Sequence, residues 1–163
     1  MKLSQPINNI YLIIVILFAI IVRLSIIIIS DFNQNVLFIG EDAWGLHLAG
    51  LDVANWENIN FFSQAKIPYI SLLAYTYKYI YPSYLIGASI SLFFWFLSVL
   101  YFIKTLNLIE VKQKYILILL IFFCFLPTMI IYSSATIREP FQLFLTNVMI
   151  FYVLKIHLTS STT

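Results

Sequence analysis

Four long apolar runs constrain the fold of this chain more than any other feature of its sequence. They cover residues 10–29, 84–103, 115–132 and 137–154, and the last is the least purely apolar. An α-helix rises about 1.5 Å per residue, so about twenty residues cross a hydrocarbon core that is about 30 Å thick. The runs lack the alternation of apolar and polar residues that membrane β-barrels show, and we therefore predict an all-α bundle of membrane-spanning helices.

Composition agrees with a lipid environment. Only 10% of the 163 residues are charged, whereas 62% are apolar. A soluble domain of this length carries about a quarter charged residues. The net charge of +2 is too small to imply nucleic acid as a partner, and the single cysteine, Cys124, excludes a disulfide framework or a thiolate metal site. The chain has no Walker loop, nucleophile elbow, dinucleotide fingerprint or paired Cys–His spacing, so nothing predicts ATP hydrolysis or redox chemistry.

The segment 66–81 decides the topology. It is apolar and aromatic but too short to span comfortably, and Pro68 and Pro82 bracket it. We therefore predict an interfacial helix here, with a polar outer loop over 31–65 before it. A fifth, tilted span remains an alternative. Six tyrosines in and after this segment suit a belt at the level of the lipid headgroups, namely Tyr69, Tyr75, Tyr77, Tyr79, Tyr81 and Tyr84.

The distribution of lysine supports four spans. With segment 66–81 in the interface, Lys2, the loop from Lys104 to Lys114 and Lys155 all fall on one side of the membrane. Short cytoplasmic loops collect Lys and Arg, so we expect both termini to be cytoplasmic, in a bacterial inner or plasma membrane. Residues 1–158 then form one transmembrane module, followed by a polar tail over 159–163.

The outer loop contains an acidic pair, Glu41–Asp42. Two adjacent carboxylates beyond a span can supply a general base, bind a hard divalent cation, or do both. Acidic residues also favour the first turn of a helix, which explains the pair without any function. His47 lies close behind on a possible interfacial helix, where packing or a headgroup contact is the simpler interpretation.

A second polar element follows the third apolar run. Thr136 and Glu139 have the spacing of a capping box, and Pro140 is tolerated in the first turn of a helix. Capping does not explain Arg138. A guanidinium at the mouth of a helix bundle needs an acidic partner, a headgroup or an anionic ligand.

Two further basic positions are candidates. Arg23 lies about two-thirds along the first span, where an ionisable residue is a functional candidate by default. A salt bridge to Asp31 or extension toward the outer interface would explain it structurally. Lys66 and Lys78 flank the aromatic segment and are expected to contact lipid phosphate.

These elements resemble the N-terminal part of the multi-spanning GT-C glycosyltransferases, a group that includes protein mannosyltransferases and aminoarabinose transferases. The resemblance covers nearly the whole chain and rests on the order of four pieces. These are the late arginine of the first span, Gly40–Ala43 leading into Leu48–Gly50, the Lys66–Leu73 proline-aromatic helix, and Phe125–Pro127 through Tyr132–Ser134 to Arg138–Pro140.

The resemblance implies a function and roles for individual residues. Such enzymes transfer a sugar from a polyprenyl-phosphate carrier to an acceptor on the outer face. Asp42 or Glu41 would be the catalytic base, and Arg138 with Lys66 would bind the carrier phosphate. Glu139 would be the acid of the second outer loop and, with Asp42, a ligand for a divalent cation. The implied partners are a lipid-linked sugar donor, membrane lipids and the remaining spans of a split enzyme.

The chain also departs from the family. Members are usually several hundred residues long, so we expect this chain to be a fragment, a split-gene product or a degenerate copy. Two other functions stay open. One is a surface-polysaccharide polymerase, although only two arginines occur in the chain. The other is a small non-catalytic membrane protein that assembles with a partner.

Overall fold

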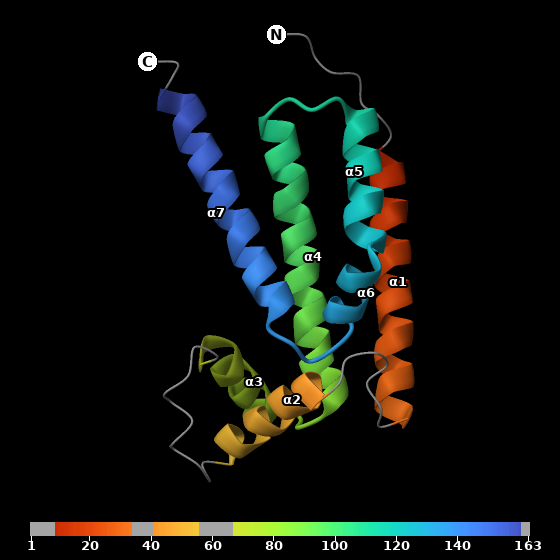
Figure 1. Ribbon diagram of the computed structural model, residues 1–163, viewed down its shortest axis with the longest axis vertical. Coiled ribbons are helices and arrows are strands. Elements are labelled where there is room, and N and C mark those ends of the chain that lie inside the picture. Colours follow the sequence, from red (N-terminus) through yellow and green to blue (C-terminus); the bar gives the residue numbers. More distant parts are fainter. Residues whose placement is uncertain (1–8, 34–40, 56–66, 161–163) are drawn as a thin grey trace.

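The computed structural model describes residues 9–33, 41–55 and 67–160, and in this part of the chain every regular element is a helix (Figure 1). The predicted all-α fold is thereby confirmed. In chain order the helices are α1 (Asn9–Asn33), α2 (Glu41–Ala54), α3 (Ile67–Tyr79), α4 (Tyr84–Leu108), α5 (Gln113–Phe125), α6 (Pro127–Ser133) and α7 (Glu139–Ser160).

Three of the described helices, α1, α4 and α7, are long and apolar enough to cross a membrane. The pair α5 and α6 makes a fourth candidate if it is counted as one bent span. The chain is therefore a membrane protein built as a helical bundle. The helices extend beyond the C-terminal ends of the predicted spans, because hydropathy marks only the residues in the hydrocarbon core, whereas helical hydrogen bonding continues into the polar interface. Helix α7 begins two residues after the predicted start of the fourth span.

The third predicted span, 115–132, is not one continuous helix. Helix α5 ends at Phe125, α6 starts at Pro127, and the two are bent by 59°. Leu126 has an extended backbone, with φ −56° and ψ 126°. Proline disfavours the helical conformation at the residue before it and has no N–H to donate, so Leu126-Pro127 breaks the span.

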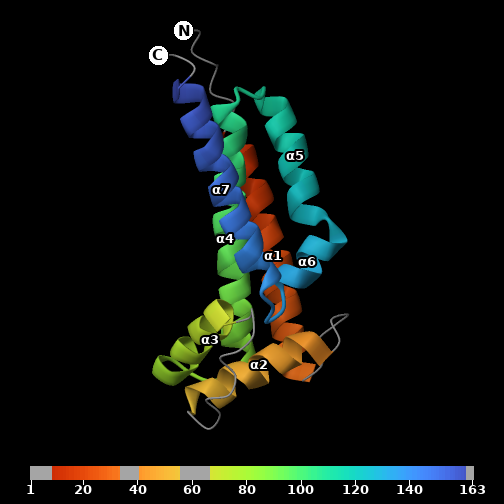
Figure 2. The same cartoon turned by 60° about the vertical axis from the view of Figure 1, so that its left-hand side comes forward.

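The two ends of the bundle differ in charge. The start of α1, the α4–α5 connection and the end of α7 lie at one end, and α2 and α3 lie across the opposite end (Figures 1 and 2). Lys104, Lys112, Lys114 and Lys155 therefore share the first end. We call α2 and α3 the cap. This grouping of basic residues is the one on which the predicted topology depends.

Helix α3 has 13 residues and a length of about 20 Å, which is too short to cross a bilayer. Its inner face packs on α2, where Gly50 permits close approach. A Cβ at Gly50 would lie 3.0 Å from both Leu73 Cβ and Tyr77 Cε2. Of the six tyrosines of the predicted headgroup belt, Tyr75, Tyr79 and Tyr81 are exposed, whereas Tyr69, Tyr77 and Tyr84 are buried and cannot belong to it.

The core of the bundle is centred on α4. Trp95 of α4 is buried between α1 and α5, together with Ala19, Leu120 and Cys124. On its other side α4 packs along α7 through aromatic rings and polar contacts. Asn147 Nδ2 of α7 donates to Ser98 Oγ at 2.7 Å and to the Ser98 carbonyl at 3.3 Å. The other spanning helices thus pack against α4, and the cap packs against its first turn.

Candidate functional site

Arg23 is completely buried and holds the break between α5 and α6. Its Nε donates to Ser133 Oγ at 2.6 Å, Nη1 to the Ala19 carbonyl at 3.0 Å, and Nη2 to the Cys124 carbonyl at 2.7 Å. The guanidinium carbon lies 3.6 Å from the centre of the Trp95 ring. The predicted salt bridge to Asp31 and the predicted extension toward the interface are both wrong, because the side chain turns into the bundle.

The proline break explains why a charge can be buried at this position. The last carbonyls of a helix have no partner within it, and the C-terminal end carries partial negative charge. Helix α5 ends beside α1, and Cys124 is among its last residues. Arg23 satisfies that carbonyl and stacks on Trp95, a contact that stabilises a cation most when it is desolvated. Among the described residues, no carboxylate pairs with Arg23, so its positive charge is not neutralised locally.

Next to Arg23 lies a groove of about 350 Å³ between α4, α6 and α7. Trp95 and Ser133, the two side chains that Arg23 contacts, form part of its wall. The indole N–H of Trp95 and Oε2 of Glu139 are buried and have no hydrogen-bond partner. The rest of the lining combines apolar and polar side chains, namely Met129, Tyr132, Pro140, Gln142, Leu143 and Thr146.

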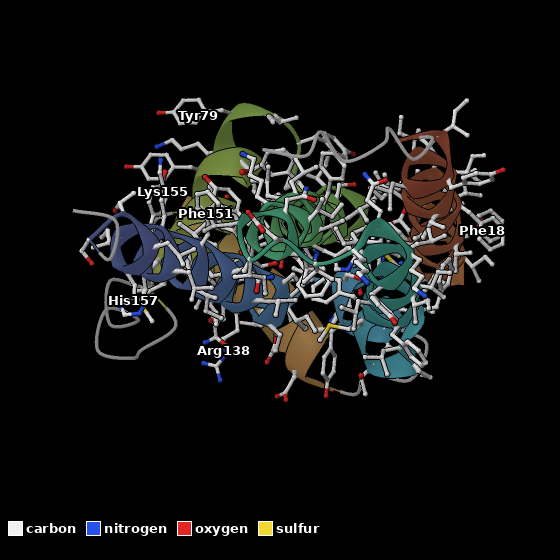
Figure 3. The ribbon with its side chains drawn as sticks, turned by 90° about the horizontal axis from the view of Figure 1, so that it is seen from above. Phe18, Tyr79, Arg138, Phe151, Lys155 and His157 are labelled. Atoms are coloured by element: carbon white, nitrogen blue, oxygen red, sulfur yellow. The ribbon has the colours of Figure 1, made fainter. Side chains whose placement is uncertain are left out.

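Glu139, the first residue of α7, lines this groove, and Arg138 precedes it as the last residue of the connection from α6 to α7. Arg138 Nε is 3.9 Å from Glu139 Oε1, and the two side chains are 36% and 44% exposed. Figure 3 shows the Arg138 side chain projecting away from the helices. An exposed ion pair of this length contributes little to stability. Both groups therefore remain available to a ligand.

Ser91 of α4 fixes the connection that carries Arg138. Its hydroxyl donates to the Ile137 carbonyl at 3.0 Å and accepts from the Ile137 N–H at 3.3 Å, and it lies 2.8 Å from the Tyr69 hydroxyl. Thr136 is also buried, with Oγ1 3.5 Å from the Tyr84 carbonyl. The predicted capping box is wrong, because α7 begins only at Glu139 and Thr136 turns toward α4 instead.

Helix α2 packs directly against the same connection. Ala43 is completely buried in a cluster with Ala135 and Ile137. Asp42, the residue before Ala43, is exposed at the start of α2. The structure thus brings the predicted acidic element and the predicted Arg138–Glu139 element to the same end of the bundle. Asp42 and Arg138, both described, form no ion pair with each other.

Some predicted site residues lie outside the part of the chain that can be described. Lys66 belongs to the 56–66 gap, and only the backbone of Glu41 is described, as the first residue of α2. Their predicted roles stay predictions. Among the described residues, no group of three or more His, Cys, Asp or Glu side chains could hold a metal ion. The predicted cation ligands Asp42 and Glu139 are therefore not joined by a third described ligand.

A buried polar cluster at the cap was not predicted as a site. His47 Nδ1 of α2 is 2.8 Å from the Tyr77 hydroxyl of α3, and the ring of Tyr84 lies beside His47 with centroids 5.8 Å apart. We call His47, Tyr77, Tyr84 and Thr136 the cap junction. The spacing of Tyr69, Leu73 and Tyr77 along one face of a helix was the sequence signal for a buried face.

Electrostatics in the cap junction favour neutral side chains. Burial lowers the pKa of His47, and the negative charge of Asp31 opposes that shift only in part. Burial also raises the pKa of Tyr77, with nearby Tyr84 adding to the increase. At neutral pH the junction therefore contains a neutral imidazole and a protonated phenol, and either can donate in their shared hydrogen bond.

Comparisons of the chain with protein-family models, with curated proteins and with solved structures find no match.

Proposed function

We propose that this chain is the N-terminal module of a membrane glycosyltransferase that moves a sugar from a polyprenyl-phosphate carrier to an acceptor on the outer face. One observation carries the proposal: the helix with the exposed Asp42 packs, through Ala43, on the connection that presents Arg138 and Glu139. A base and a phosphate-binding cation on neighbouring elements are the minimum that such a transfer needs.

Charge in this region suits a phosphate-linked lipid. Arg138 is exposed and its guanidinium can make forked hydrogen bonds to phosphate oxygens. The positive charge of Arg23 lies behind Trp95 in the wall of the adjoining groove. Glu139 and, on the neighbouring helix, Asp42 are the described carboxylates of the site. An anion that leaves the sugar would be stabilised by the Arg138 guanidinium.

The groove offers space for the lipid part of the carrier. It runs along α7 from Glu139 to Thr146, between helices that are apolar enough to cross a membrane. Met129, Pro140 and Leu143 provide apolar lining for an isoprenoid chain. In this arrangement the phosphate lies at Arg138 and the chain enters the groove beside it. Asp42 would then deprotonate the acceptor from the cap side.

Carrier binding tests the first half of the proposal. The protein is reconstituted in nanodiscs and titrated with a long-chain polyprenyl phosphate, with binding measured by native mass spectrometry. Losing a charge-assisted contact to phosphate costs about 1.5–3 kcal/mol, so Arg138→Gln should weaken binding by about tenfold or more. Lys155→Gln is the matched control, because it removes one positive charge near the far end of α7, at the opposite end of the bundle. Equal weakening by both substitutions would show nonspecific attraction and contradict the phosphate site.

Transfer tests the second half. In the complete enzyme, Asp42→Asn should abolish sugar transfer while leaving membrane insertion and polyprenyl-phosphate binding unchanged, because the amide cannot act as a base. Transfer at an undiminished rate would exclude Asp42 as the base. Absence of any polyprenyl-phosphate binding by the wild-type chain would favour the non-catalytic alternative instead.

A further inference from the structure

The Tyr77 hydroxyl lies at the point where the cap, the bundle and the α6–α7 connection meet. Tyr77 belongs to α3 and is buried. Its hydroxyl is 2.8 Å from His47 Nδ1 on α2 and lies near the side chain of Thr136 on the connection, because both would meet a Cβ placed at Gly87. One phenol therefore joins an element of the cap to the segment that leads into Arg138 and Glu139.

The first turn of α4 leaves space for this arrangement. Gly87 of α4 faces both partners: a Cβ there would meet the Tyr77 hydroxyl and would lie 2.8 Å from both Oγ1 and Cγ2 of Thr136. Real Cβ atoms essentially never approach other atoms so closely. Hence the Tyr77–Thr136 contact forms only because position 87 has no side chain.

From these contacts we infer that the Tyr77 hydroxyl is a positioning group, which fixes α2, with Asp42, relative to the connection that carries Arg138 and Glu139. His47 follows Asp42 on the same helix, and Thr136 precedes Arg138 by two residues. A shift of the Tyr77 hydroxyl therefore reaches Asp42 and Arg138 over only a few residues. The catalytic meaning of this role rests on the proposed function, whereas the geometric role does not.

Loss of the hydroxyl should loosen the contact without unfolding the bundle. Tyr77→Phe keeps the ring, which packs in a cluster with Tyr69 and Leu73, but leaves His47 Nδ1 without its partner. A buried polar group without a partner costs about 1–3 kcal/mol, which favours movement of α2 away from the connection. The core around Trp95 includes Tyr84 but not Tyr77, His47 or Thr136, and it should keep its packing.

Distance measurements by pulsed electron spin resonance test the geometric role in the full chain. With Cys124→Ser, spin labels are placed at Leu48 on α2 and Leu145 on α7, which are both exposed. Tyr77→Phe should broaden or shift this distance distribution. Tyr79→Phe, which removes an exposed hydroxyl from the same helix, should not. A second label pair, at Ile14 on α1 and Met149 on α7, should be unaffected by either substitution.

Thr136 supplies a conservative pair of variants. Thr136→Val removes the hydroxyl at nearly constant shape and should reproduce the effect of Tyr77→Phe, whereas Thr136→Ser keeps the hydroxyl and should restore the narrow distribution. Unchanged α2–α7 distances in Tyr77→Phe would overturn the inference. Broadening of both label pairs would overturn it too, because it would indicate general loss of packing.

An activity measurement keeps the two proposals separate. In the complete enzyme, Tyr77→Phe should lower kcat for sugar transfer by about tenfold or more, since small misplacements of a reacting group are costly, with KM for the carrier little changed. An α2–α7 distance that changes in an enzyme without transferase activity would contradict the proposed function and leave the positioning role intact.

Discussion

The Arg23 guanidinium donates to the carbonyl oxygen of Cys124 at 2.7 Å, across 101 positions of the chain. This contact joins the first span to the broken third span. Pro127 interrupts the helix and frees carbonyls near its end, and Arg23 satisfies one of them. The arginine and the proline are therefore two parts of one structural device, and Trp95 and Ser133, which Arg23 contacts, line the adjoining groove.

Replacing Arg23 by methionine should destabilise the bundle. The side chain would lose three hydrogen bonds and leave the Cys124 carbonyl unpaired in an apolar interior, so we expect a loss of about 3 kcal/mol in the free energy of unfolding. Thermal unfolding in detergent measures the loss, and maleimide labelling of the buried Cys124 should become faster. Arg138→Met, at an exposed position, should change neither; equal effects of the two substitutions would contradict the assigned role of Arg23.

Alanine at two glycine positions should act in opposite directions. Gly87→Ala forces a Cβ onto Tyr77 and Thr136 and should cost about 1–3 kcal/mol. Gly45→Ala in α2 meets no atom within 4 Å and should stabilise the protein by about 0.5–1 kcal/mol through helix propensity. The same thermal measurement compares the two. If Gly87→Ala left thermal stability unchanged, the cap junction would be less tightly packed than described.

Ser91→Ala should release the α6–α7 connection. It leaves the Ile137 carbonyl and the Tyr69 hydroxyl without this partner, whereas the Ile137 N–H keeps its bond to the Ala135 carbonyl, so we expect a loss of about 2 kcal/mol. Hydrogen exchange at Ile137 should become faster. Ser25→Ala is the control, because its hydroxyl is exposed and bonds only within its own helix, and it should leave that exchange unchanged.

Stability should depend on pH through His47. Its pKa is lowered by burial, so the unfolded chain binds a proton more readily than the folded one just below pH 6.5. Stability is then fully present above the unfolded pKa and is lost as pH falls from there toward the folded pKa. Thermal unfolding between pH 8 and pH 5 should show this decrease. His47→Gln should remove the decrease that is due to this group, and His157→Gln, at the exposed end of α7, should retain it.

Much of the fold could be predicted because lipid imposes simple rules. Twenty apolar residues without alternation predict a spanning helix, and a short aromatic segment between prolines predicts one that does not span. The prediction that the Glu41–Asp42 and Arg138–Glu139 elements share one side of the membrane followed from the number of spans and from the distribution of lysines between the two sides. No individual contact was needed for either prediction.

The details of the site could not be predicted in the same way. The partner of Arg23 is a backbone carbonyl, and every residue has one, so no side-chain pattern identifies Cys124. Similarly, the buried Tyr69 and Tyr77 are the same residue type as the exposed Tyr75 and Tyr79. Only the packing of α3 on α2 and α4 decides which of the four are buried. Thr136 has the spacing of a cap, but the space at Gly87 directs it toward α4 instead.

The position of Arg23 also bears on how the protein is made. The ribosome completes the first span long before it reaches Cys124, and a central arginine costs about 2.5–3.5 kcal/mol on insertion. The surrounding isoleucines and leucines are apolar enough to outweigh that cost. Until the fifth helix arrives, however, the newly inserted arginine must stay near water, lipid phosphate or the translocation machinery. We therefore expect a late step in biogenesis, in which the Arg23 guanidinium leaves water, lipid phosphate or the translocation machinery and binds the Cys124 carbonyl.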